Sequence, residues 1–122
     1  MLKVKTYVGP STIEGVGLFA AEFIPAGTLI FQEDEYTQLI TKEEYSNMSE
    51  IQREFIDRYS YFNEGVYKVS MDNDRFTNHS STPNTIDQGD VTIARLNIRE
   101  GEEITADYKD LFETNDSLQT FP

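Results

Sequence analysis

Cysteine and tryptophan are absent from this 122-residue chain, and histidine occurs once, at His79. The lack of cysteine excludes disulfides and thiolate zinc sites. A single histidine leaves few nitrogen ligands for a metal of the zinc type. We therefore expect a protein that holds no metal ion.

Basic residues are scarce, since 10 Lys and Arg stand against 22 Asp and Glu, which gives a formal net charge of −12. This charge repels phosphate backbones, so nucleic-acid binding is not expected. It attracts basic partners, such as a lysine-containing protein or peptide. Many proteins are acidic for solubility alone, and the charge does not decide between these two interpretations.

Long hydrophobic runs are also missing. No apolar stretch approaches the roughly 20 residues of a membrane helix, and the alternating N-terminal segment lacks the apolar stretch of a signal peptide. We expect no membrane association and a location in the cytoplasm, or in the nucleus if the source is eukaryotic or viral. Hydrophobic residues make up 38% of the chain, which predicts a single globular domain over residues 1–122.

Short strands separated by Gly and Pro turns dominate the pattern. Strands are expected at residues 1–8, 18–20, 28–31, 36–40, 66–69 and 90–96. The turn at residues 23–27 resembles in sequence the turn at residues 97–101. Many short strands with little helix predict a mostly β domain with short α segments.

Two capping boxes mark the starts of helices, because Thr41 is followed by Glu44 and Ser49 by Gln52 at the required spacing. After the second box, apolar residues recur at helical spacing over residues 49–60. These apolar residues are Ile51, Phe55, Ile56 and Tyr59. The pattern predicts one amphipathic helix whose apolar stripe packs in the core.

The run from Asp74 to Asn84 contains the single histidine among small polar residues. Pro83 excludes a regular helix or central strand there, and Asn84 suits a turn. With Phe76 as an aromatic anchor, this loop is expected to bind a ligand. Asp74 and its acidic neighbour at position 72 lack the spacing of a calcium loop, so they favour a turn or the attraction of a basic substrate.

Three ordered motifs span most of the chain. Residues 14–20 read EGVGLFA, residues 75–80 read RFTNHS and are followed by Pro83-Asn84, and residues 101–108 read GEEITADY. Together they resemble the motifs of SET-domain protein lysine methyltransferases, in particular small stand-alone members of bacterial or viral type. The resemblance implies the SET fold over the whole chain, with small curved sheets, a C-terminal knot-like threading and a short tail at residues 110–122.

The resemblance also implies a site for the cofactor S-adenosyl-L-methionine beside a lysine channel. It assigns the catalytic role, alignment of the methyl donor with the amine, to Tyr108, which the threading would bring next to Asn78 and His79. The residues implied in cofactor binding are Gly15, Val16, Gly17, Asn78, His79 and Phe112. For the tyrosine implied in the substrate channel, Tyr59, Tyr61 and Tyr67 are candidates, and Tyr67 lies closest to the central loop.

Two departures from the family pattern stand out. Glu14 occupies a position that is often basic in the family, and the cysteine-rich segment that closes the cofactor pocket in larger relatives is missing. Residues such as Phe112, or a second subunit in a homodimer, would have to replace that segment.

The resemblance therefore implies a protein-lysine N-methyltransferase that transfers a methyl group from S-adenosyl-L-methionine to a lysine amine of a basic protein. The alternative is a catalytically weak SET-fold module that binds basic segments through its acidic surface. In a third interpretation the motif matches are coincidental, and Tyr108 then has no reason to lie near Asn78.

Overall fold

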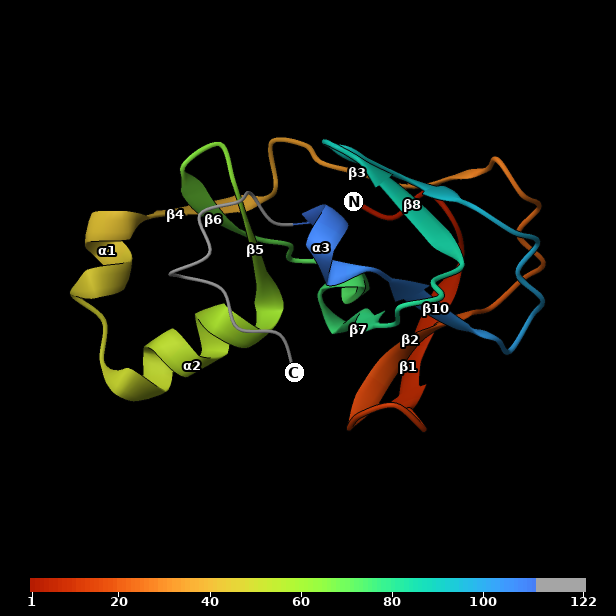
Figure 1. The fold of residues 1–122 in the computed structure, drawn as a ribbon, viewed down its shortest axis with the longest axis horizontal. Coiled ribbons are helices and arrows are strands. Elements are labelled where there is room, and N and C mark those ends of the chain that lie inside the picture. Colours follow the sequence, from red (N-terminus) through yellow and green to blue (C-terminus); the bar gives the residue numbers. More distant parts are fainter. Residues whose placement is uncertain (112–122) are drawn as a thin grey trace.

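Three small β-sheets form the framework of the computed structural model, which describes residues 1–111 (Figure 1). The first sheet has the order β1-β2-β10-β7, with bounds Thr6–Pro10, Val16–Ala20, Glu103–Ala106 and Asn78–His79. The second has the order β3-β9-β8, with bounds Leu29–Gln32, Val91–Ala94 and Thr85–Gln88. The third has the order β4-β6-β5, with bounds Gln38–Thr41, Val66–Val69 and Ser60–Asn63.

The helices are short, and two of the four lie at one end of the molecule. They are α1 (Lys42–Ser46), α2 (Glu50–Tyr59), the 3-10 helix η1 (Asn73–Phe76) and α3 (Tyr108–Leu111). Figure 1 shows α1, α2 and the third sheet on one side, the other two sheets on the opposite side, and α3 between them. The prediction of a mostly β protein with short helices is confirmed. Within residues 1–111, no helix combines the length and the apolar character needed to cross a membrane.

Strand β10 pairs with its two neighbours in opposite senses. It runs antiparallel to β2, with Ile104 opposite Leu18, and parallel to β7, with Thr105 opposite Asn78. This pairing places residues 105–106 beside residues 78–79 of the central loop. The knot-like threading itself stays a prediction.

The two turns with similar sequences lie side by side in the structure. Ile24 and Ile98 exchange two backbone hydrogen bonds of 2.8 Å, one in each direction. Each turn ends in a glycine with positive φ, 88° at both Gly27 and Gly101, a conformation that glycine adopts without a Cβ penalty. The repeated sequence therefore encodes two copies of one turn that pair with each other.

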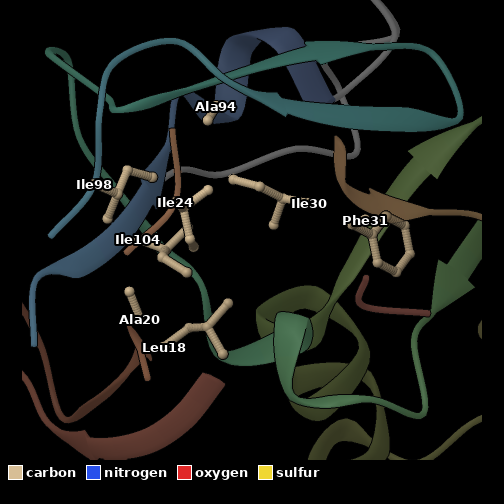
Figure 2. Close-up of a cluster of buried hydrophobic side chains, with 8 residues drawn as sticks. All are labelled: Leu18, Ala20, Ile24, Ile30, Phe31, Ala94, Ile98 and Ile104. Atoms are coloured by element: carbon tan, nitrogen blue, oxygen red, sulfur yellow. The ribbon is translucent and has the colours of Figure 1, made fainter. Parts of the chain in front are cut away.

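The main hydrophobic core joins the first two sheets (Figure 2). Its members are Leu18, Ala20, Ile24, Ile30, Phe31, Ala94, Ile98 and Ile104. Burial of these hydrophobic side chains removes them from water and supplies the dominant stabilisation of the fold. A second cluster under the third sheet contains Ile40, Ile56, Phe62, Tyr67 and Val69.

Both predicted capping boxes are present. Thr41 Oγ1 accepts from the Glu44 N–H at 3.0 Å and Glu44 Oε1 accepts from the Thr41 N–H at 2.8 Å. Ser49 and Gln52 make the equivalent pair at 3.2 and 2.9 Å. Local hydrogen bonds of this kind depend on neighbouring residues, so the sequence is sufficient to locate them.

The prediction that the apolar stripe of α2 packs in the core is wrong for most of its members. Only Ile56 is buried, whereas Ile51 is 79% exposed and Phe55 is 45% exposed. The helix packs against β5 and β6 at the edge of the molecule, and this contact covers only part of the stripe. The first strand also differs, since β1 begins at Thr6 and Leu2 instead forms an isolated bridge to Phe31.

Candidate functional site

Tyr108 is held against the central loop by two hydrogen bonds. Its hydroxyl donates to the carbonyl of Thr77 at 2.7 Å, and its backbone N–H donates to His79 Nδ1 at 3.0 Å. Burial raises the pKa of the Tyr108 hydroxyl, which keeps it protonated as a donor. The predicted approach of Tyr108 to the central loop is confirmed, and the interpretation that the motifs are coincidental fails.

His79 acts on Tyr108 through a defined tautomer. Because Nδ1 accepts the N–H of Tyr108, the proton of the neutral ring is on Nε2. The two rings are tilted with centroids 5.1 Å apart. In this arrangement the histidine positions the first residue of α3.

The Asn78 side chain connects the central loop to the first motif. Its amide nitrogen lies 3.1 Å from the carbonyl of Glu14, 3.0 Å from that of Val16, and 2.9 Å from Glu103 Oε2, donating toward all three oxygens. The side chain is buried, so the amide takes its partners from the protein itself. Asn78 therefore fixes the course of the chain around residues 14–16.

Gly17 is required by a contact within the protein. A Cβ at this position would clash with Glu103 Oε2 and would lie 2.9 Å from Glu103 Cδ and 3.2 Å from Asn78 Nδ2. The same carboxylate accepts hydrogen bonds from the Ser11 hydroxyl at 2.8 and 2.9 Å. The glycine lets Glu103 join the β1–β2 hairpin to the central loop, and any role toward a ligand is additional.

Gly15 has a different reason to be glycine. Its φ is +48°, in the left-handed region that disfavours other residues, and a Cβ there would meet only Arg58 Nη2 at 3.6 Å. Arg58 Nη1 pairs with Glu14 Oε1 at 3.3 Å, so the unusual acidic residue of the first motif has a basic partner on α2. The hydrogen bonds from Arg58 to Tyr59 and Glu14 raise the pKa of the guanidinium further, and it remains charged.

A cavity of about 720 Å³ lies where these elements meet. Of the predicted site residues, Val16, Asn78 and Tyr108 line it, together with main-core residues including Leu18 and Ile104. Gly15, Gly17 and His79 are not among the lining residues, and His79 contacts the lining residue Tyr108.

Tyr67 does not line the cavity. It lies in the second hydrophobic cluster, with its ring stacked on Tyr45 at 4.5 Å and against the edge of Phe62 at 5.0 Å. The cavity wall instead contains Tyr59 and Tyr61 from α2 and β5. Phe112 falls outside the described residues.

The cavity wall is rich in carboxylates. The acidic residues that line it are Glu14, Glu54, Asp57, Asp74 and Asp87, against the basic residues Arg58 and Arg75. Burial raises the pKa of Asp74 to about 7, although a hydrogen bond from Ser70 opposes this shift. Within residues 1–111, no three His, Asp or Glu side chains are arranged to hold a metal ion.

A partly buried ion-pair network supports the same wall. The Tyr61 hydroxyl donates to Glu33 Oε1 at 2.9 Å, and the buried Lys68 ammonium donates to the two Glu33 oxygens at 2.9 and 3.0 Å. Burial and the bond to Glu33 raise the pKa of Tyr61. Sequence reasoning missed the roles of Glu33 and Glu103 because their partners lie far along the chain, although Glu103 falls within the third motif. Tyr61 was among the candidate tyrosines, but Tyr67 was preferred to it.

The geometry agrees with comparisons to known proteins. A family profile described as the SET domain matches residues 15–109. The histone-lysine N-methyltransferase trr of Drosophila melanogaster is 32% identical over an aligned length of 136 residues. The alignment covers 95% of this chain and 5% of that protein. The human histone-lysine N-methyltransferase 2D is 32% identical over an aligned length of 131 residues. The alignment covers 91% of this chain and 2% of that protein. This chain therefore spans only a small part of these curated relatives.

Solved structures show the same similarity. A chain from an apo form of polycomb repressive complex 2 with mutations in Ezh2 has a TM-score of 0.73 at 25% identity, covering 91% of this chain and 16% of that chain. A candidate histone methyltransferase of Plasmodium falciparum has a TM-score of 0.66 at 24% identity, covering 88% of this chain and 95% of that chain. The second likeness extends over almost the whole of both chains.

Proposed function

Because this chain belongs to the SET domain family, we propose that it is a protein-lysine N-methyltransferase that uses S-adenosyl-L-methionine. The observation that carries the proposal is the placement of Tyr108. The cavity it lines also contains Asn78 and Val16, so the residues of all three motifs meet around one space.

The cavity suits the cofactor in size and charge. Its volume of about 720 Å³ is within the range of roughly 300–1,000 Å³ that is usual for small-molecule sites. The carboxylates in its wall complement a positive sulfonium, and Arg58 complements the carboxylate of the methionine portion. We propose that Val16 and Asn78 line the bound cofactor, with Gly15, Gly17 and His79 supporting them. The bound cofactor would supply an activated methyl group.

Lysine methylation sets two requirements for the protein. The amine must lose a proton, which at a pKa of about 10.4 costs roughly 4–5 kcal/mol at neutral pH. It must also point at the methyl carbon, and rigid side chains achieve this by orientation. Tyr108 meets the second requirement, because its hydroxyl is fixed on the Thr77 carbonyl at 2.7 Å and its backbone on His79.

The substrate that fits this surface is a basic protein segment. The chain carries a net charge of −12, and carboxylates of α2 line the cavity. Opposite charge raises the rate of encounter and the local concentration of a cationic segment. Since relatives are named histone-lysine methyltransferases, we propose histone-like basic segments as the first substrates to test, with the cytoplasm or the nucleus as the site of action.

One observation favours the alternative of a binding module with weak catalysis. Glu14 and Arg58 pair at 3.3 Å beside the first motif, and this pair competes for the guanidinium that the cofactor carboxylate would use. In that case the acidic surface binds basic segments and the cavity does not bind the cofactor.

Calorimetric titration with S-adenosyl-L-methionine and its demethylated product distinguishes the two functions. The methyltransferase should bind both saturably, Asn78→Ala should abolish binding, and Tyr108→Phe should largely preserve binding while reducing methyl transfer to mixed histones. Absence of binding at millimolar cofactor would contradict the proposal and favour the binding module.

A further inference from the structure

The carboxyl group of Asp74 has no part in the reaction proposed above. It lies on η1 in the cavity wall that also contains Tyr61 and Tyr108. Its Oδ1 accepts a hydrogen bond from the Ser70 hydroxyl. Among residues 1–111, no Lys, Arg or His nitrogen pairs with this carboxyl. A carboxylate without a basic partner inside a cavity is costly unless a cation enters.

Asp74 is fixed relative to Tyr108 by a single turn. The Thr77 carbonyl accepts the Tyr108 hydroxyl at 2.7 Å, and the Thr77 N–H donates to the Asp74 carbonyl at 3.0 Å. The side chain of Thr77 also donates to the Asp74 carbonyl, at 2.6 Å. The backbone of Asp74 and the phenol of Tyr108 are therefore joined through Thr77, and both residues line the same cavity.

The charges around Asp74 do not neutralise it. Burial and the negative charge of Asp72 favour its protonated form, which places its pKa at about 7, whereas the Ser70 hydrogen bond and the amino terminus act in the opposite direction. Two further groups share this part of the wall, Tyr61 on β5 and Asp87 on β8. The guanidinium of Arg75 instead lies over the Phe76 ring, 5.1 Å from its centroid.

We propose that Asp74 receives the ammonium group of the target lysine and accepts its proton before methyl transfer. This inference rests on the proposed function. A carboxyl that titrates close to the working pH is well matched to this task, because it is ionised often enough to accept a proton and returns the proton readily to water.

The step balances in atoms and charge. A proton passes from the lysine ammonium to the Asp74 carboxylate, which leaves a lone pair on the amine nitrogen. That nitrogen then bonds to the methyl carbon while the carbon–sulfur bond breaks, with its electron pair remaining on sulfur. The methylated amine carries the positive charge, and Asp74 returns its proton to solvent when the product leaves.

The first test needs no turnover and measures the titration of Asp74 by carbon NMR of its carboxyl group. Saturating n-butylammonium, which reproduces the lysine side chain, should lower the pKa of Asp74 by about one unit or more, because a nearby cation favours the carboxylate. The neutral analogue n-butanol should leave it unchanged. Equal effects of the two probes, or none, would overturn the proposal.

The second test compares Asp74→Asn with Asp72→Asn in methyl transfer to mixed histones. Asp74→Asn should lower kcat by about 100-fold, remove the rise of kcat around pH 7, and leave the Kd for the cofactor within about twofold. Asp72→Asn removes a charge outside the cavity lining and should keep both kcat and the inflection, moved to slightly lower pH. If the wild type is active and Asp74→Asn has the same pH profile of kcat, this inference alone is overturned. If the wild type does not bind the cofactor, the proposed function is overturned as well.

Discussion

The carboxylate of Glu103 fills the space in which a side chain at Gly17 would begin, and the same carboxylate accepts hydrogen bonds from Ser11 and Asn78. The first and third motifs therefore meet where Gly17 contacts Glu103. Because Asn78 belongs to the remaining motif, the three segments depend on one another for their positions around the cavity.

Gly17→Ala should destabilise the fold by about 1–3 kcal/mol, because a methyl group would collide with the Glu103 carboxylate. Gly9→Ala is the matched control on the neighbouring strand, since its Cβ would meet other atoms only at 3.6 Å or beyond. Urea unfolding of both variants measures the difference. Adding Glu103→Ala to Gly17→Ala should recover part of the loss, and strict additivity of the two changes would contradict the proposed contact.

Glu103→Gln should weaken cofactor binding and lower stability by about 1–3 kcal/mol, because the amide nitrogen cannot accept the hydrogen bonds that the second carboxylate oxygen accepts. Glu102→Gln, which changes an exposed carboxylate paired with Arg99, is the control and should have little effect. Denaturant unfolding and calorimetry provide the two measurements. Equal behaviour of the two variants would show that Glu103 has no special role.

Asp74 should make the protein less stable as pH rises. Its pKa is about 7 in the folded state against a reference value of 3.8, so the folded protein binds this proton more tightly than the unfolded chain does. The stability from this group is complete below about pH 4 and is lost as pH rises through about 7, by roughly 2–4 kcal/mol.

Asp74→Asn should abolish this component of the pH dependence, so that the variant is more stable than the wild type at pH 8. Melting temperatures at pH 5 and pH 8 measure the effect as the difference between the two proteins. Asp72→Asn should retain most of the wild-type dependence. Parallel curves for wild type and Asp74→Asn would show that the folded state does not raise the pKa of Asp74.

A pair of isoleucines on α2 tests the finding that this helix buries only one side of its apolar stripe. Ile56→Ala should cost about 2–5 kcal/mol because its side chain is buried in the second cluster. Ile51→Ala, on the same helix but 79% exposed, should change stability by less than about 0.5 kcal/mol. A large cost at Ile51 would indicate that another part of the protein covers this face.

Features that depend on neighbouring residues were predictable from the sequence, and features that depend on distant contacts were not. The capping boxes at Thr41 and Ser49 were located correctly because both partners lie within one helical turn. Helical spacing identified the apolar stripe of α2, but spacing cannot say whether another element covers that stripe. Ile51 belongs to this stripe and is nevertheless exposed.

The same division applies to the site. The motifs identified Tyr108 and Asn78, and both line the cavity. Tyr67 was chosen for its closeness in sequence to the central loop, yet its side chain packs in the second hydrophobic cluster. Tyr61 was another candidate, but the sequence could not favour it, because its position depends on a contact with Glu33, which follows β3 and lies 28 residues away in the chain.

The two hydrophobic clusters also bear on how the molecule unfolds. One wall of the cavity consists of main-core residues such as Leu18 and Ile104, and another consists of Tyr59 and Tyr61 from the elements that cover the second cluster. A molecule bound between them would contact both and bind only when both are folded. Occupancy of the cavity would thus join two separately packed regions into one cooperative unit, whose stability rises with ligand concentration.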